Sequence, residues 1–163
     1  MDTDGMLKAL EEQESVLRFD SIDFKTLTRI SLRICEKKKS LDKTAYILTT
    51  VNGLSVFSLA MPGATKNNED WARRKSNLTL RYSMSSLHAT LNMQRNGKTL
   101  EICGMDSRDY GLSGGSFPIL LKSGVCIGSI TVSGMTEWED HQTVSDAIAE
   151  ELGVEIPSIL SFV

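Results

Sequence analysis

The sequence predicts a single domain of the α+β class, with a sheet of antiparallel strands covered by helices. Two observations lead to this class. Strand-like runs come in neighbouring pairs joined by tight turns, which is the pattern of β-hairpins. Helical patterns stand before, between and after these pairs instead of alternating with single strands, so no βαβ units are indicated. A length of 163 residues fits one domain with a substantial core.

The N-terminal part of the chain predicts two helices and a short strand. Residues 4–14 permit a helix, and residues 16–19 follow as a short strand. Asp20 or Ser21 can cap the next helix, in which apolar residues recur at near-helical spacing: Phe24, Leu27, Ile30 and Ile34. The lysines at 37–39 place positive charge at the negative end of that helix, so we interpret this run as structural.

A hairpin and a third helix occupy the middle of the chain. Asn52-Gly53 separates two β-rich runs and suits the positive φ angles of a two-residue turn. Met61-Pro62-Gly63 ends the second run, and a polar loop leads to a helix that begins near Glu69. Lys75 falls on the stripe of this helix that carries its large apolar side chains, Trp71, Leu78 and Tyr82.

The next segment fits more than one structure. Residues 83–86 loosen the preceding helix, and residues 87–93 are compatible with either a helix or a strand. We favour a strand that continues toward the turn at Asn96-Gly97. Residues 98–110 can then hold a short helix.

A second hairpin and a final helix complete the domain. Residues 119–121 pair with residues 125–132, and apolar side chains alternate with hydroxyls along the second strand. Thr136 or Asp140 caps the last helix, and Gly153 stops it. We assign residues 1–155 to the domain and residues 156–163 to an apolar C-terminal tail, which docks on its own protein or on a neighbouring subunit.

Composition argues against several classes of partner. A formal charge of −3 and a pI near 5.4 disfavour nucleic acid and anionic membrane, because both need a basic surface. The acidic start lacks the pattern of a secretory signal, and no stretch nears the ~20 apolar residues of a membrane span, so we expect a cytoplasmic protein. Cys35, Cys103 and Cys126 are widely spaced and odd in number, which suits reduced thiols packed as small apolar groups.

The glycine-rich stretch from Gly111 to Gly134 is the best place to look for a site, because glycines cluster where a backbone turns sharply or approaches another group. Its backbone amides could form an anion-binding nest. Polar residues elsewhere could meet this loop or could instead form caps and ion pairs. The candidate ligand-binding residues are Arg74, Lys75, Ser85, Ser86, Gly114, Gly115, Ser116, Asp140 and His141.

No catalytic residue and no metal site is predicted. No serine lies in the strained turn that exposes a hydrolase nucleophile, and the cysteines and histidines have no recognised ligand spacing. We therefore favour binding over catalysis and leave enzymatic activity open. His88 and His141 are the only histidines, so an imidazole ligand to haem would have to be one of them.

A series of short motifs gives a family resemblance. In order they are MPG, WARRK followed by SS, GKTLE, DYGLSGGSFPI, GSITVSGM and EDHQTVSDAI. By these motifs the chain resembles, from about Leu7 to Leu152, the small cytosolic members of the haem-degrading-domain superfamily, which are relatives of GlcG and HbpS.

The resemblance implies a compact domain with helices on both faces of the sheet, similar to profilin-like and PAS-like folds, and homo-oligomers built from dimers. Ser113 and His88 depart from the family, since many relatives have a histidine and an aromatic residue there. Any function that depends on that missing histidine is put in question. The resemblance implies that the family's characteristic positions are Trp71, Arg74, Lys75, Ser85, Ser86, Gly114, Gly115, Pro118, Gly134, Asp140 and His141.

Three classes of function remain open. We favour a non-catalytic homo-oligomeric protein that binds an unknown small ligand between the Gly114-Gly115 loop, the helix of Arg74 and Lys75, and Asp140-His141. One alternative is an interaction or adaptor protein that acts through its oligomer surface and its C-terminal tail. The other is a haem-binding or haem-degrading protein with His88 or His141 as axial ligand, and haem is the one cofactor that the resemblance suggests.

Overall fold

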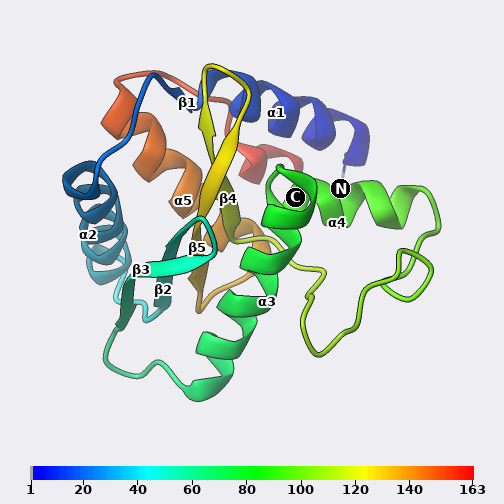
Figure 1. Ribbon diagram of the computed structural model, residues 1–163, viewed down its shortest axis with the longest axis horizontal. Helices are drawn as coiled ribbons and strands as arrows, with labels where there is room; N and C mark the ends of the chain where they lie inside the picture. The colour runs from blue at the N-terminus through cyan, green and yellow to red at the C-terminus, as the bar shows by residue number, and fades with distance from the viewer. Residues whose placement is uncertain (1) are drawn as a thin grey trace.

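The computed structural model describes residues 2–163 and contains a five-stranded sheet with the order β1-β4-β5-β2-β3 (Figure 1). The strands are β1 (Arg18–Phe19), β2 (Tyr46–Val51), β3 (Leu54–Ala60), β4 (Ser116–Leu121) and β5 (Cys126–Ser133). The pairs are antiparallel except β1 with β4, which are parallel. The α+β class and the largely antiparallel sheet are therefore confirmed.

Helices cover both faces of this sheet, as expected (Figure 1). They are α1 (Thr3–Val16), α2 (Phe24–Ser40), α3 (Lys66–Tyr82), α4 (Ser86–Arg95), α5 (Glu137–Leu152) and the short 3-10 helix η1 (Ile159–Phe162). The main core lies between the sheet and α2 with α5, and includes Ile30, Ile34, Ile47, Ile119, Ile130, Val132, Val144 and Ile148. Within the described part of the chain, no helix combines the length and the apolarity needed to cross a membrane.

The two faces of β5 carry different chemistry, as the alternation predicts. Ile130 points into the main core, whereas Ser129 lies beneath α3. The Ser129 hydroxyl is 2.7 Å from that of Ser76 on α3 and 2.9 Å from that of Thr50 on β2. The hydroxyls thus hydrogen-bond to one another where α3 covers the polar face of β5. Both faces of this strand are therefore buried.

The predicted turn at Asn52-Gly53 is present and joins β2 to β3. Both residues have positive φ, 50° at Asn52 and 78° at Gly53, which is the requirement of a two-residue hairpin turn. The second hairpin also forms, but β4 begins at Ser116, earlier than the predicted 119. Gly153 ends α5 with φ of 65°, as predicted.

The prediction of a strand at 87–93 is wrong, because this segment lies within α4. The Ser85 hydroxyl caps the helix by accepting a hydrogen bond from the His88 amide at 3.2 Å. Leu91 packs with α1 on one side of the helix, and Met93 packs with α3 and the following loop on the other. Burial on two sides lets an alternating sequence pattern form a helix.

Two boundaries and one further predicted helix also differ from the prediction. Asp23, rather than Asp20 or Ser21, caps α2 by accepting from the Thr26 amide. The third helix begins at Lys66 instead of near Glu69, since a capping box precedes it. Residues 98–110 form a series of turns and no regular helix.

Residues 156–163 fold back on the domain. Ile159 is fully buried among apolar residues of α1 and α4: Met6, Leu7, Leu10, Leu87 and Leu91. The Asp2 amide donates to the Phe162 carbonyl at 3.1 Å, so the two ends of the described chain lie side by side (Figure 1).

Candidate functional site

A buried network of charged groups lies where three of the predicted segments meet. The ammonium of Lys38 on α2 is 3.0 Å from one carboxylate oxygen of Asp140, and that of Lys75 on α3 is 3.2 Å from the other. The side chains of Lys38 and Asp140 are fully buried and that of Lys75 is 4 % exposed. The backbone amides of Gly134 and Met135 also donate to Asp140.

This network contains two basic groups and one acidic group. Burial lowers the pKa of Lys75, and the attraction of Asp140 only partly offsets that effect. Sequence reasoning did not find Lys38, which it assigned to a structural run at the end of α2. Lys38 and Asp140 are 102 residues apart, so no local pattern could pair them.

The glycine-rich loop fits against this network with no spare space. A Cβ atom at Gly115, where φ is +124°, would lie 2.6 Å from the Val132 carbonyl oxygen and 2.8 Å from the Lys75 ammonium nitrogen. The Gly114 amide donates to Glu137, and the Ser116 amide donates to the Ser86 hydroxyl at 3.1 Å. These two amides of the expected anion nest are thus paired with protein groups.

Arg74 points away from Lys75, its neighbour in the chain. Its guanidinium stacks over the Trp71 ring at 4.0 Å and donates to the Asp70 carboxylate at 2.9 Å. The structure therefore brings Lys75, Gly115 and Asp140 into contact, whereas Arg74 belongs to a separate cation–π and ion-pair group.

His141 lies in the interior and links α5 to α1. Its Nε2 is 2.8 Å from the Gln13 side-chain oxygen, and its ring packs against Phe117 with centroids 5.8 Å apart. Burial lowers the pKa of His141 to about 3, so the ring is neutral at physiological pH. Its Nδ1 is buried and has no hydrogen-bond partner among residues 2–163.

His88 is also buried, with 6 % of its surface exposed, and joins α4 to α1. Its Nδ1 is 3.0 Å from one oxygen of Glu14, whose other oxygen accepts from the Ser85 amide at 2.8 Å. Burial acts to lower the pKa of His88, but the hydrogen bond and charge of Glu14 outweigh it and raise the pKa. The two histidines thus have different hydrogen-bond partners and opposite pKa shifts, and the charge of His88 adds to the lowering of the His141 pKa.

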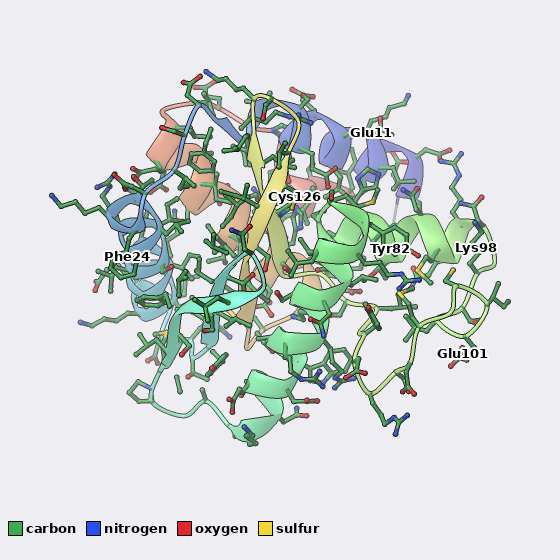
Figure 2. All side chains as sticks on the ribbon, in the orientation of Figure 1. Glu11, Phe24, Tyr82, Lys98, Glu101 and Cys126 are labelled. Atoms are coloured by element: carbon green, nitrogen blue, oxygen red, sulfur yellow. The ribbon has the colours of Figure 1, made fainter. Side chains whose placement is uncertain are left out.

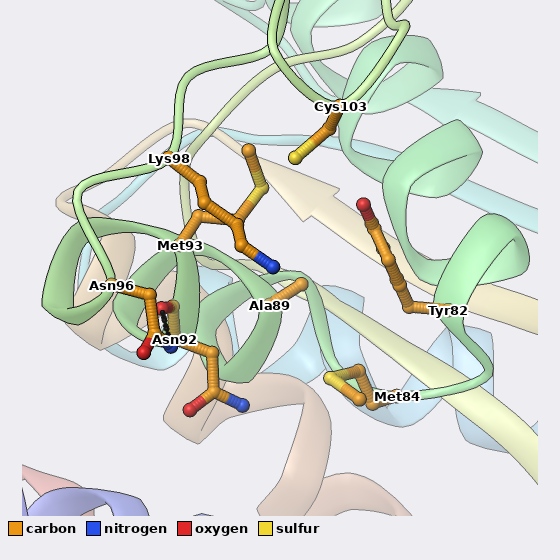
Figure 3. A pocket seen from close by; sticks show the side chains of 8 residues that line it. All are labelled: Tyr82, Met84, Ala89, Asn92, Met93, Asn96, Lys98 and Cys103. Atoms are coloured by element: carbon orange, nitrogen blue, oxygen red, sulfur yellow. Dashed lines mark hydrogen bonds between the residues drawn. The ribbon is translucent and has the colours of Figure 1, made fainter.

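An open cleft of about 370 Å³ lies between the end of α3, α4 and the loop that follows α4 (Figure 3). Figure 2 shows Tyr82 at the end of α3 and Lys98 on that loop. The lining residues are Tyr82, Met84, Ala89, Asn92, Met93, Asn96, Lys98 and Cys103. Sequence reasoning missed this cleft, because it predicted a strand at 87–93 and a helix at 98–110.

The cleft combines an apolar wall with a few polar groups. The Tyr82 ring and the thioethers of Met84 and Met93 form the apolar part, and the Lys98 ammonium points across the cleft toward Ala89 (Figure 3). The Asn96 side chain donates to the Asn92 carbonyl at 2.7 Å and so holds the start of the loop against α4. Apolar walls with few polar groups are typical of sites for small molecules.

Two residues predicted from the sequence control the position of the α4 wall. Ser85 caps α4, and Ser86 accepts from the Ser116 amide at the start of β4. Both side chains are fully buried. Ser86 therefore connects the cleft wall to the sheet and Ser85 caps the helix that forms this wall, and neither residue lines the cleft. The part of the chain that the structure describes holds no cluster of three or more His, Cys, Asp or Glu side chains placed to bind a metal ion.

Comparisons with known proteins agree with this architecture. A family model described as "Haem degrading protein HbpS-like" matches residues 19–149. A UPF0303 protein of Rhizobium rhizogenes (strain K84 / ATCC BAA-868) is 40% identical over 153 residues, which cover 94% of each chain. The crystal structure of the Ybr137w protein matches with a TM-score of 0.83 and 22% identity, covering 92% of this chain and 90% of that chain. A PduOC:heme complex matches with a TM-score of 0.68 and 18% identity, covering 85% of this chain and 98% of that chain.

Proposed function

Within the family described as "Haem degrading protein HbpS-like", to which the chain belongs, we propose that this protein is homo-oligomeric and binds a small ligand without transforming it. One observation carries the binding function, namely the cleft beside α4. Its volume of about 370 Å³ falls within the ~300–1,000 Å³ of small-molecule sites. The homo-oligomer is what the family resemblance implies.

The cleft is a better ligand site than the buried network around Asp140. Each carboxylate oxygen of Asp140 already accepts hydrogen bonds from the protein, and a ligand there would have to displace Lys38 or Lys75. Displacement would leave a buried charge without its partner, which costs about 3–5 kcal/mol. The network therefore serves as a frame, and the cleft supplies the contacts to the ligand.

The chemistry of the cleft supports binding rather than catalysis. Its lining contains one ammonium, two amides, a phenol and a thiol, but no carboxylate or imidazole. Imidazole is the most frequent group in general acid–base catalysis and carboxylates are also common, whereas the lysine, tyrosine and cysteine present here serve that role only with a suitable pKa. The proposal that the protein is not an enzyme rests on this composition of the lining.

A thermal-shift screen with a metabolite panel that includes hemin tests the proposal. The matched variants are Asn92→Trp, which places an indole in the cleft, and Gln94→Trp, which places one on an exposed part of the same helix. A ligand held at about 100 times its dissociation constant should stabilise the wild type and Gln94→Trp by about 2.7 kcal/mol. Asn92→Trp should give no shift. A ligand that stabilises all three proteins equally would place the site elsewhere.

Haem binding is a second candidate, favoured by the likeness to the PduOC:heme complex. The residues fit haem only in part. Coordination through Nε2 of His141 would break its bond to Gln13, whereas the cleft offers tyrosine, methionine and cysteine, all of which can ligate haem iron. Hemin titration of the wild type, Asn92→Trp and His88→Ala decides the matter. A shifted Soret band that survives both substitutions would rule out the cleft and His88 as the site.

An adaptor function through the C-terminal tail stays a prediction. Deletion of residues 157–163 would also remove Ile159 from the cluster of α1 and α4. A pulldown with the milder variant Leu160→Asp, at an exposed position, would test the tail without uncovering that cluster.

A further inference from the structure

We infer that the cleft between α3 and α4 selects an amphiphile with one anionic head and an apolar body, such as an aryl or alkyl carboxylate or sulfonate. The inference rests on the proposed function and specifies the chemical class of its ligand. Two properties of the cleft support this inference: its lining carries a positive and no negative group, and its apolar wall contains flexible methionine side chains.

The charge of the cleft is opposite to that of the whole chain. The sequence contains 21 acidic and 18 basic residues, yet no acidic side chain lines the cleft and Lys98 does. Lys98 forms no ion pair and no side-chain hydrogen bond with any residue in the range 2–163. Nearby cations are engaged, since Arg95 pairs with Asp4 and Arg81 donates to the Cys103 carbonyl.

The position of Lys98 makes its ammonium available to a ligand. Its backbone amide donates to the Met93 carbonyl at 2.9 Å, which fixes the loop directly after α4. From that point the side chain extends over the cleft with its ammonium toward the lining residues, while Lys98 as a whole stays exposed to solvent (Figure 3). An ammonium without a partner beside an apolar surface favours a ligand that supplies a negative charge.

The wall opposite this charge suits an apolar body of variable shape. Tyr82 and Met84 are half-buried, and they pack against the cluster that contains Ala89, Met93 and Met105. Methionine is unbranched and polarizable, so it adapts to ligands and makes favourable contacts with aromatic rings. The cleft thus provides apolar area on one side and a single positive group on the other.

The test uses two dyes that share an anilinonaphthalene body: 1-anilinonaphthalene-8-sulfonate, which carries one negative charge, and N-phenyl-1-naphthylamine, which is neutral. Their fluorescence is titrated at low salt with the wild type, Lys98→Met, Lys98→Arg and a control, Lys39→Met. Lys39 is exposed at the end of α2 and does not line the cleft. Circular dichroism confirms that each variant is folded.

The wild type should bind the sulfonate on the order of tenfold more tightly than the neutral dye, which is the value of about one charge-assisted hydrogen bond. Lys98→Met should remove that preference and leave the neutral dye unaffected. Lys98→Arg and Lys39→Met should retain it. Added salt should weaken the sulfonate alone.

The inference that the ligand has an anionic head would be wrong if the wild type bound both dyes with equal affinity. It would also be wrong if Lys98→Met changed both affinities equally. The Asn92→Trp variant separates this failure from failure of the proposed function. If Asn92→Trp blocks both dyes while Lys98→Met has no effect, the cleft binds ligands but does not select anions. If neither dye binds, or if Asn92→Trp blocks neither, the cleft is not the binding site and both proposals fail.

Discussion

Replacing Lys75 by methionine should cost little stability, although the side chain is buried and ion-paired. At an effective dielectric constant of about 20, the 3.2 Å contact with Asp140 is worth about 5 kcal/mol of attraction. Burying an ammonium costs several kcal/mol, so the two terms nearly cancel. The variant keeps the Lys38–Asp140 pair and removes the excess positive charge. We therefore expect a loss below about 1.5 kcal/mol.

Asp140→Asn is the matched comparison, because it changes one atom in the same network. It leaves Lys38 and Lys75 buried without a negative partner, so it should cost about 3–5 kcal/mol. The assay is urea unfolding followed by circular dichroism at one protein concentration, which keeps any association constant. A loss for Lys75→Met as large as that for Asp140→Asn would refute this account of the charges.

The pH dependence of stability gives an independent check on Lys75. Its pKa is lower in the folded protein than the ordinary value of 10.5. Between the folded and ordinary values the unfolded chain binds more protons, so stability should rise with pH in that window. The rise should be absent in Lys75→Met. Urea unfolding of both proteins from about pH 7 to about pH 10 measures it, and a constant difference between them would contradict the lowered pKa.

Three other outcomes can be measured. Gly115→Ala, with φ of +124° and no room for Cβ, should destabilise by more than about 2 kcal/mol, whereas Gly53→Ala, in open space, should cost about 1 kcal/mol by urea unfolding. Glu14→Gln should lower the pKa of His88 in an NMR titration. In the wild type, the interaction of His88 with Glu14 contributes its full stabilisation of the folded state below pH 6.5, and this contribution is lost as pH rises through the raised pKa. His141 should not titrate near neutral pH, and His141→Gln should reduce the loss of stability as pH falls from 6.5 toward about 3. Equal costs at the glycines, an unmoved His88 or a neutral-range transition of His141 would each contradict the reasoning.

The sequence predicted those elements whose signals are local. Asn52-Gly53 marks a turn by its backbone preference alone, and Gly153 ends a helix for the same reason. The alternation of apolar and hydroxyl side chains around Ile130 predicted the two faces of β5, because each side chain in a strand contacts only the layer on its own side of the sheet.

The α4 segment could not be predicted in the same way. Leu87, Ala89, Leu91 and Met93 alternate with polar residues, which is the pattern of a strand that is buried on one face. In the structure the same residues form a helix. One side of this helix packs against α1, and the other packs against apolar residues of α3 and the following loop, such as Leu78 and Met105. The cleft depends on this helix, so an error in one element concealed the site.

The buried network around Asp140 could not be predicted from local sequence patterns, for a different reason. Lys38 resembles its neighbours in a run of lysines, and only its contact with a residue on a distant helix distinguishes it. Thr136 or Asp140 was predicted to cap α5; Thr136 takes that position and leaves the carboxylate of Asp140 free for the lysines. Partners so far apart in the chain are set by tertiary packing.

The contact between α1 and η1 bears on how the protein is made. The first helix buries Met6 and Leu10 against Ile159, a residue that leaves the ribosome more than a hundred positions later. During synthesis at ~5–20 residues per second, α1 must therefore remain without its final covering for about 7–30 s. Until then the apolar side of α1 lacks its contact with Ile159, so closure of this contact belongs to the last steps of folding.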